Sequence, residues 1–503
     1  MRQILKQILI VLLCMLSALL LRAGEDSTAG GTRRLELSLD DAIAMARVRS
    51  VDAAAALDEL RTAYWEWRSF RAAQLPELTF EATAPAYSRQ YTPYMNDRGE
   101  YSFVRTNNLQ AKGSLTLTQN VALTGGKVAL TTSLDFLRQL DGAKNNRFMS
   151  IPVAVTLTQP LFGVNTQRWD RRIEPVRYAE AKAAFLSATE DVAGLAVDYY
   201  FTLLMCRENA EIARQNLENA RALYAVAQEK REMGKISRND LLQMELNVLD
   251  AESDLTDTRS DLRSAMFQLV AFLDLDGDVE IVPDVPGGAP HADIVYADAL
   301  DRALANNKFV KTMLRRQLDA DYEVARAKGD MRAINLFVQL GYTGADATFG
   351  SAYERLRSNQ MASVGFSIPL VDWGRRRGRV KVAESNRRVT ESMVRRETMN
   401  FNQSLFVLVE RFDNQQQRLE LARRAAGIAA QRYDTNVKTY MIGMLSTLEL
   451  NDSRLSKDSS RRQYISQLHL FWKYWYQLRS LTLHDYETGT DIEADIEKLV
   501  KMQ

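Results

Sequence analysis

The chain has 503 residues, 46% hydrophobic and 26% charged, and its 65 basic and 64 acidic side chains leave a net charge of +1. This length exceeds one small domain, and the balanced charge argues against a nucleic-acid-binding protein, which would carry a basic excess. The histidines and cysteines have no metal-ligand spacing, and the sequence has no nucleophile-elbow, phosphate-loop or His-Glu-x-x-His motif. We therefore expect no enzyme, no cofactor, no metal and no nucleic-acid partner.

The first residues have the pattern of a secretory signal. Arg2 and Lys6 precede an almost wholly apolar run over residues 8–21, and Ala23 and Gly24 follow it. Such a run is short for a membrane-spanning helix and suits a signal peptide, here residues 1–23, with a retained anchor as the alternative. No later stretch is apolar enough for a transmembrane helix, so entry into a membrane would require a closed β-barrel.

Two helices and a set of strands are predicted next. Residues 38–49 and 51–73 have helical patterns, and the Leu75-Pro76 pair ends the second helix. In the segments that follow, apolar side chains alternate with small or polar ones, which predicts strands with one apolar face. A soluble half-buried sheet and a membrane sheet between lipid and water both fit this pattern. The predicted strands cover residues 76–87, 114–123, 128–136 and 153–161.

A very long helical hairpin completes this half of the chain. Residues 169–233 predict one helix about 100 Å long, and residues 237–273 predict a return helix. Along the return helix, apolar residues recur every seven positions from Leu241 to Leu269. A second set, from Met244 to Phe272, lies three positions further on and includes small side chains. This spacing predicts a coiled-coil interface with close helix approach.

The remaining chain repeats this order of elements. Residues 276–293, rich in proline and glycine, are predicted to link a first repeat at 36–275 to a second repeat at 294–485, and residues 486–503 form a polar tail. The predicted elements of the second repeat are helices within 294–330, strands at 333–343 and 362–370, a long helix at 378–441 and a return helix at 446–482.

Two landmarks show that the halves are duplicates. Pro160 and Pro369 lie 209 residues apart, and Gly234 and Gly443 keep the same offset. A constant offset indicates a duplicated supersecondary unit. Between Phe80 and the last strand of the first repeat, however, there are 48 additional residues. We expect them to form an extra hairpin around residues 125–126, with a loop at 89–108 at the opposite end of the sheet.

The order, duplication and spacing of these motifs resemble the TolC-like outer-membrane efflux proteins. The residues that carry the likeness are 157–162 and 366–374, which end the strands, and the two Gly-x-x-Ser turns of the long hairpins. The resemblance implies a mainly α fold with a membrane β-barrel portion: a duplicated repeat of strands and a long helical hairpin. Three protomers would share one barrel in the Gram-negative outer membrane and extend an α-helical tunnel into the periplasm.

The family's partners and gate are also implied. A periplasmic adaptor protein, bound to an inner-membrane pump, would meet the hairpin tips. A hydrogen bond between Tyr440 and Asp240 would close the tube, and Glu449 and Asp452 would form acidic rings in the lumen. Leu445 stands where the family has an arginine, so that part of the gate is altered, and a solvated helix face is the alternative for the acidic pair. The expected adaptor-contacting residues are Gly234, Lys235, Ile236, Ser237, Gly443, Met444, Leu445 and Ser446.

Basic side chains follow the last predicted strand of each repeat. Arg375, Arg376 and Arg377 occupy this place in the second repeat, and Arg168 and Arg171 occupy it in the first. We expect them to reach lipid phosphates at the periplasmic rim of the barrel, with a solvated helix start as the alternative.

The function expected from these features is a passive exit duct of a tripartite efflux or type I-like secretion system, gated at its helical tip. The alternative is an exported periplasmic coiled-coil scaffold with a small soluble sheet. That scaffold would not require strands before each long hairpin.

Overall fold

A computed structural model describes residues 33–96, 99–141, 145–234, 236–275, 279–331, 334–366, 371–441, 444–445 and 447–501. The expected signal peptide and residues 367–370, which include Pro369, lie outside these ranges. Internal contacts divide the chain into two compact units. The first comprises Met1–Ala46 with Asp198–Gly287, and the second comprises Arg47–Val197 with Gly288–Gln503.

The first unit contains a helical hairpin and a small parallel sheet. Helix α4 (Thr166–Glu232) enters this unit and α5 (Arg238–Phe272) returns, while β1 (Arg33–Leu37) pairs with β6 (Val279–Pro283). The buried Tyr200 hydroxyl donates to the carbonyl oxygens of Leu37 at 2.9 Å and Asp284 at 2.7 Å. This side chain therefore fastens the ends of both strands to α4. Neither strand was predicted, and β6 lies within the expected linker.

The predicted coiled-coil interface of α5 is confirmed. Leu255, Ala265 and Leu269 are buried, and the other heptad positions from Leu241 to Phe272 are half-buried. Leu255 packs against Ala213 and Leu217 of α4. The buried face follows the seven-residue spacing because that spacing keeps one stripe of a helix facing its partner.

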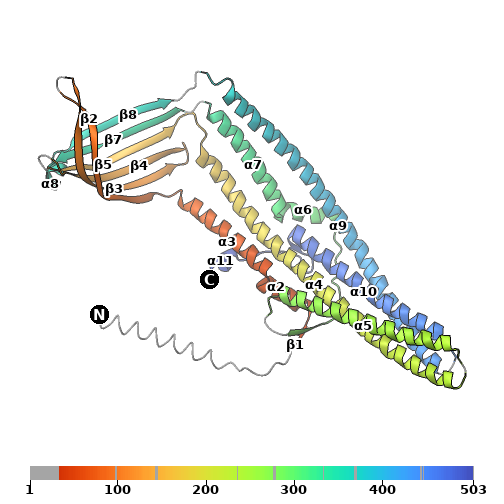
Figure 1. Ribbon diagram of the computed structural model, residues 1–503. Helices are drawn as coiled ribbons and strands as arrows, with labels where there is room; N and C mark the ends of the chain where they lie inside the picture. The colour runs from red at the N-terminus through yellow and green to blue at the C-terminus, as the bar shows by residue number, and fades with distance from the viewer. Residues whose placement is uncertain are drawn as a thin grey trace. The chain divides into compact units, whose positions relative to one another are not determined.

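The second unit is built on a six-stranded antiparallel sheet with the strand order β2-β3-β4-β5-β7-β8, and the strands lie side by side in Figure 1. The first repeat supplies four strands and the second supplies two, so the extra hairpin expected from the additional residues is confirmed. The strands are β2 (Glu77–Met95), β3 (Tyr101–Val121), β4 (Gly126–Gln139), β5 (Asn146–Pro160), β7 (Ile334–Asp346) and β8 (Arg357–Phe366).

Helices complete the second unit, and α9 and α10 form its long hairpin (Figure 1). Phe412 of α9 packs against Phe471 and Trp475 of α10, with ring centroids 5.3 and 5.8 Å apart. No described helix combines the length and apolar character needed to cross a membrane. The remaining helices are α2 (Leu39–Arg49), α3 (Val51–Ala72), α6 (Tyr296–Asn306), α7 (Lys308–Gly329), α8 (Phe349–Glu354), α9 (Arg375–Met441), α10 (Thr447–Thr482) and α11 (Ile496–Lys501).

One expectation about local structure was wrong. The segment at 89–108 is mostly strand, because β2 runs on to Met95 and β3 begins at Tyr101. In the polar tail at 486–503, β10 (Thr490–Asp491) pairs with β9 (His484–Asp485), which lies directly before the tail, and α11 follows. In both places a pairing partner stabilises a polar segment that has little apolar periodicity of its own.

Candidate functional site

The sheet has one apolar and one polar face. The strand register places one apolar side chain from each of five neighbouring strands in a single row. Every member of this row is exposed in the single chain. On the opposite face, Thr116 and Thr131 lie opposite each other and share a hydrogen bond of 3.3 Å. A sheet whose apolar side is exposed is suited to contact with lipid. The row consists of Leu78, Leu117, Leu130, Val155 and Leu340.

The sheet is open at both sides in one chain. β2 forms one edge and β8 the other, and neither pairs with a further described strand. An unpaired edge presents a row of backbone N–H and C=O groups, which other strands can pair with. The two edges differ in length, since β2 has 19 residues and β8 has 10.

The Gly125-Gly126 turn lies at the end of the sheet where α3 and α4 attach. Val121 pairs with Gly126 there, and Gly125 adopts a positive φ of 76°. The Asn165 side chain, just before α4, donates to the Ala122 carbonyl oxygen at 2.9 Å. Gln119 donates to the Gln74 carbonyl oxygen at 3.0 Å, which ties β3 to the end of α3. We call this end of the sheet the helical rim.

The predicted basic residues lie at the helical rim. Arg168 and Arg171 are exposed, and the Arg171 guanidinium donates to the Gln74 side chain at 3.1 Å. Arg375 and Arg377 are also exposed, whereas Arg376 is half-buried and donates to the Met331 carbonyl oxygen. These basic residues therefore lie at the start of α4 and α9, the long helices that follow the strands of each repeat.

Large apolar side chains accompany these charges at the helical rim. Trp373 is 96% exposed and has a positive φ of 52°, and Leu75, Leu123 and Phe162 are exposed as well. The Asp372 carboxylate accepts hydrogen bonds from the amides of Gly374 and Arg376. These bonds hold the pKa of Asp372 below its usual range. Exposed tryptophan next to arginine is typical of side chains that lie at a membrane interface.

The tip of the first hairpin turns at Gly234, whose φ of 69° favours glycine. Ser237 caps α5, and Asp240 completes a capping box by accepting from the Ser237 amide at 3.1 Å and hydroxyl at 2.7 Å. These bonds lower the pKa of Asp240. Asp240 therefore has a local role in capping, independent of any partner across the tip. Lys235 lies outside the described residues.

The tip of the second hairpin is described in part. Met444 and Glu449 are exposed and Leu445 is half-buried, whereas Gly443, Ser446 and the Tyr440 side chain lie outside the described residues. The expected Tyr440–Asp240 bond therefore stays a prediction. Asp452, expected to form an acidic ring like Glu449, makes an ion pair with Arg432 of α9 at 2.9 Å, and both side chains are largely exposed.

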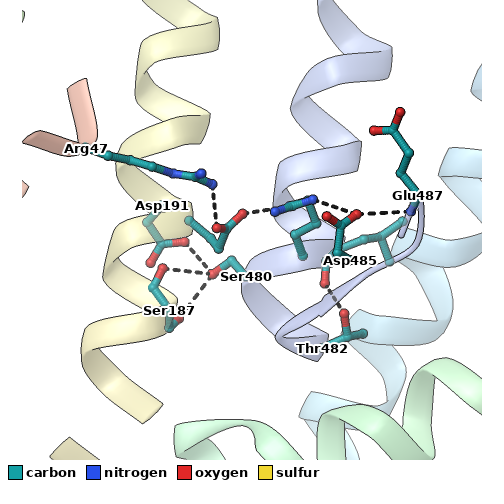
Figure 2. Close-up of polar contacts among 10 residues, drawn as sticks. Arg47, Ser187, Asp191, Ser480, Thr482, Asp485 and Glu487 are labelled. Carbon is teal, nitrogen blue, oxygen red and sulfur yellow. Dashed lines mark hydrogen bonds and ion pairs between the residues drawn. The ribbon is translucent and has the colours of Figure 1, made fainter. Parts of the chain in front are cut away.

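A buried ion-pair network was not predicted from the sequence. Figure 2 shows it where α2, α4 and α10 meet the C-terminal strands. Glu190 of α4 is 2% exposed and accepts from Arg47 of α2 at 2.5 Å and from Arg479 of α10 at 2.8 Å. Arg479 also pairs with Asp485 at 2.8 Å. The Glu190 carboxylate thus binds the guanidinium groups of two arginines from different helices.

Hydroxyl groups and a second carboxylate extend this network. Ser480 donates to Asp191 at 2.6 Å and lies 3.1 Å from the Ser187 hydroxyl (Figure 2). Although burial opposes its charge, the Glu487 amide and the Arg479 guanidinium hold the pKa of Asp485 below its usual range. Ser187 and Glu190 are spaced like the apolar positions of α4 around them, from Ala183 to Val197. A polar residue in an apolar heptad register is the signal that could have revealed the network.

Comparisons with known proteins agree with this architecture. The family model described as outer membrane efflux protein matches residues 42–273 and 299–481, which is most of the chain. The chain therefore belongs to the outer membrane efflux protein family. No curated protein matches the sequence. The two matched segments each contain one long helical hairpin, as the duplicated order of elements requires.

Solved outer-membrane channels share the fold at low identity. The CmeC outer membrane channel of Campylobacter jejuni is 14% identical, with a TM-score of 0.64 over 92% of this chain and 88% of that chain. VceC of Vibrio cholerae is 14% identical, with a TM-score of 0.59 over 90% and 97%. The open state of the Neisseria gonorrhoeae MtrE channel is 13% identical, with a TM-score of 0.58 over 94% and 96%.

Membership of the family defines the broad function. The protein is an exit duct of a tripartite efflux system, located in the Gram-negative outer membrane with a helical extension in the periplasm. Channels of this family are homotrimers that work with adaptor and pump partners, and the family is one of transport proteins rather than enzymes. The alternative of a periplasmic scaffold is not retained. Among the described residues, no group of His, Cys, Asp and Glu could hold a metal ion.

Proposed function

We propose that three copies of this chain form one duct, with β2 of each copy pairing with β8 of the next. The observation that carries the proposal is a sheet with an exposed apolar face, a polar face and two open edges. Each backbone group left unpaired in lipid costs several kcal/mol, so the edges require partners. In the assembly, Leu117 and Leu130 face lipid, and Thr116 and Thr131 line a water-filled passage.

The subunit count tests this proposal directly. Protein extracted in mild detergent is expected to have the protein mass of three copies in light scattering coupled to gel filtration, because pairing of the sheet edges holds the copies together. The detergent contribution is removed by measuring absorbance and refractive index together. A monodisperse species with the mass of one copy would exclude the shared sheet.

The helical rim faces the periplasm, and Arg168, Arg171, Arg375, Arg376 and Arg377 contact lipid phosphates there. The hairpin tips meet a periplasmic adaptor that is bound to an inner-membrane pump. Solutes then pass through the duct passively. We further propose that residues 36–275 and 294–485 are the two structural repeats, joined by 276–293 and followed by the tail.

Surface labelling tests the orientation. A cysteine at Asn96, in the turn between β2 and β3, is expected to react with an impermeant thiol reagent added to intact cells. A cysteine at Lys127, beside the turn at the helical rim, is expected to react only after the outer membrane is permeabilised. The reverse pattern would contradict the orientation. The two sites lie at opposite ends of the sheet, because β3 runs from one turn to the other.

The gate is proposed at the hairpin tips, with Tyr440 and Asp240 bonded across the closed tip and Glu449 and Asp452 lining it. Loss of one such bond costs on the order of 1 kcal/mol, and three symmetric pairs add up. Tyr440→Phe combined with Asp240→Ala is therefore expected to raise single-channel conductance in planar bilayers. Glu449→Ala with Asp452→Ala is expected to weaken cation selectivity, because acidic rings concentrate negative potential.

A matched variant separates the gate from helix capping. Ser237→Ala removes the cap of α5, at a cost of about 1 kcal/mol, but leaves the Asp240 carboxylate in place. It is expected to conduct like the parent protein. If Ser237→Ala raises conductance as much as the gate variant does, capping explains the effect. If both double variants conduct and select like the parent, the tip is not the gate.

A further inference from the structure

The hairpin of β2 and β3 continues beyond the rest of the sheet. Pairing between β3 and β4 ends at Asn108 and Gln139, but β2 and β3 remain paired as far as Met95 and Tyr101. At about 3.3 Å per residue, the additional length is on the order of 20 Å. We call residues 88–108 the distal ribbon, because it lies at the end of the sheet opposite the helical rim.

The distal ribbon has two unlike faces. The pairs Tyr91–Arg105 and Met95–Tyr101 place their side chains on one face, because directly opposed residues point the same way. The other face carries Gln90, Ser102 and Tyr94. All large side chains of the first face are exposed in the single chain. This aromatic face comprises Arg89, Tyr91, Pro93, Met95, Tyr101, Phe103, Arg105 and Asn107, together with Tyr87 directly before the ribbon.

The aromatic face continues the apolar face of the sheet. Along β3, Tyr101, Phe103 and Leu109 have the same alternation as Leu115 and Leu117, and the pairing of β3 with β4 has no register shift. The one shift between β2 and β3 lies between Thr83 and Ala86, before the ribbon begins. The face of the sheet that is proposed to contact lipid therefore continues into the ribbon without a change of side.

The position of the ribbon relative to the bilayer follows from strand lengths. On β4, the apolar face runs from Val128 to Phe136, which is on the order of 25 Å along the strand. This run is close to the roughly 9–11 residues with which a tilted β-strand crosses a membrane. Arg138 follows on the same face, at the level of Leu109 and Tyr87. The aromatic face therefore lies at and beyond the level of the outer headgroups.

The charge of the aromatic face is positive. Arg89 and Arg138 form no ion pair with any described residue, while Arg105 pairs with Asp141 at 3.0 Å. The Asp141 carboxylate, which also accepts from Asn107 at 3.2 Å, neutralises Arg105, so the positive charge of this face comes from Arg89 and Arg138. Guanidinium groups bind phosphate oxygens in a bidentate manner, and aromatic side chains are enriched where a membrane meets water. The chemistry matches an anionic, phosphate-bearing surface with apolar parts.

We propose that the aromatic face of the distal ribbon binds the phosphate-bearing glycolipid headgroups of the outer leaflet, of the lipopolysaccharide type. Arg89 and Arg138 contact phosphate, and Tyr87 and Phe103 contact the upper acyl chains and the sugars. A neighbouring copy does not cover the whole ribbon, because β8 has too few residues to pair along all of β2. This inference rests on the proposed placement of the sheet in the membrane.

Spin labels on opposite faces of the ribbon test the proposal. Tyr91 and Tyr94 are 70% and 57% exposed, so Tyr91→Cys and Tyr94→Cys are matched variants with little effect on folding. Both are made with Cys206→Ala in the full chain and reconstituted in phosphatidylcholine nanodiscs, with or without lipopolysaccharide. Lipopolysaccharide is expected to lower the accessibility of the label at 91 to a water-soluble relaxant several-fold, and that at 94 less than twofold.

Arginine variants and a parallel assay complete the test. Arg89→Gln with Arg138→Gln is expected to abolish most of the protection at position 91, whereas Arg147→Gln, on the other face of β5, retains it. Equal responses of the two labels, or no response to lipopolysaccharide at 91, would overturn the inference. Subunit mass and conductance are measured on the same samples. A conducting trimer in which lipopolysaccharide does not protect position 91 would reject only the binding proposed for the ribbon. A sample that contains no trimer would reject the proposed duct.

Discussion

Glu190→Ala is expected to lower the free energy of unfolding by up to about 3–5 kcal/mol, because Arg47 loses its buried partner and the mostly buried Arg479 keeps only Asp485. Removal of one member of a buried ion pair costs more than the pair itself contributes, since the remaining charge is left desolvated. The measurement is urea unfolding of the purified protein in detergent, followed by the helical circular dichroism signal.

The control for this prediction lies on the same helix. Glu218 pairs with Arg214 but its side chain is 65% exposed, so Glu218→Ala is expected to change stability by less than about 1 kcal/mol. Glu190→Gln keeps the shape and one acceptor, and its effect is expected to fall between the two. A Glu190→Ala protein as stable as Glu218→Ala would show that Arg47 and Arg479 find other partners or water.

The second large effect is expected on the apolar face of the sheet. Leu130→Arg should destabilise the folded membrane protein by about 2–4 kcal/mol, because it places a charge at the middle of the proposed lipid-facing row. The free energy is measured by reversible unfolding from phosphatidylcholine vesicles in guanidinium chloride. The yield of trimer in cells is expected to fall in parallel.

The adjacent position supplies the control. Thr131→Arg puts the same side chain one residue further along β4, on the polar face, where water solvates it. Thr131→Arg is expected to lower the free energy of unfolding by at least about 1 kcal/mol less than Leu130→Arg does. Its main effect should be on ion selectivity. Equal destabilisation by Leu130→Arg and Thr131→Arg would mean that the two faces do not meet different solvents.

Local periodicity was sufficient to predict the main elements. The seven-residue spacing from Leu241 to Leu269 identifies the buried face of α5, because a helix repeats its contacts at that interval. Alternation around Leu117 and Leu130 predicts the strands and their two faces, because strand side chains alternate. The offset of 209 residues that the Gly234–Gly443 and Pro160–Pro369 pairs share indicates the duplication. These signals require no knowledge of distant partners.

The ends of elements depended on the tertiary structure. Residues 89–108 contain arginine, asparagine and proline, which weaken any strand prediction, yet β2 and β3 pair throughout most of this segment. The pairing satisfies backbone groups whatever the side chains are, so sequence pattern alone does not show where it stops. The strands β1 and β6 were not predicted for the same reason, because both are short and they pair with each other although they are far apart in the sequence.

Contacts between residues that are far apart in the chain could not be predicted from the sequence. Glu190 is surrounded along α4 by apolar neighbours, but only the tertiary structure brings Arg47 and Arg479 to it, 143 and 289 residues away. The capping bonds between Ser237 and Asp240 differ from these contacts, because their three-residue spacing is a local signal of a helix N-terminus that the sequence already contains. The sequence by itself thus determined the repeats, the elements and their faces, which follow from local spacing. Burial and long-range pairing, which set the energies of individual side chains, were decided by the fold.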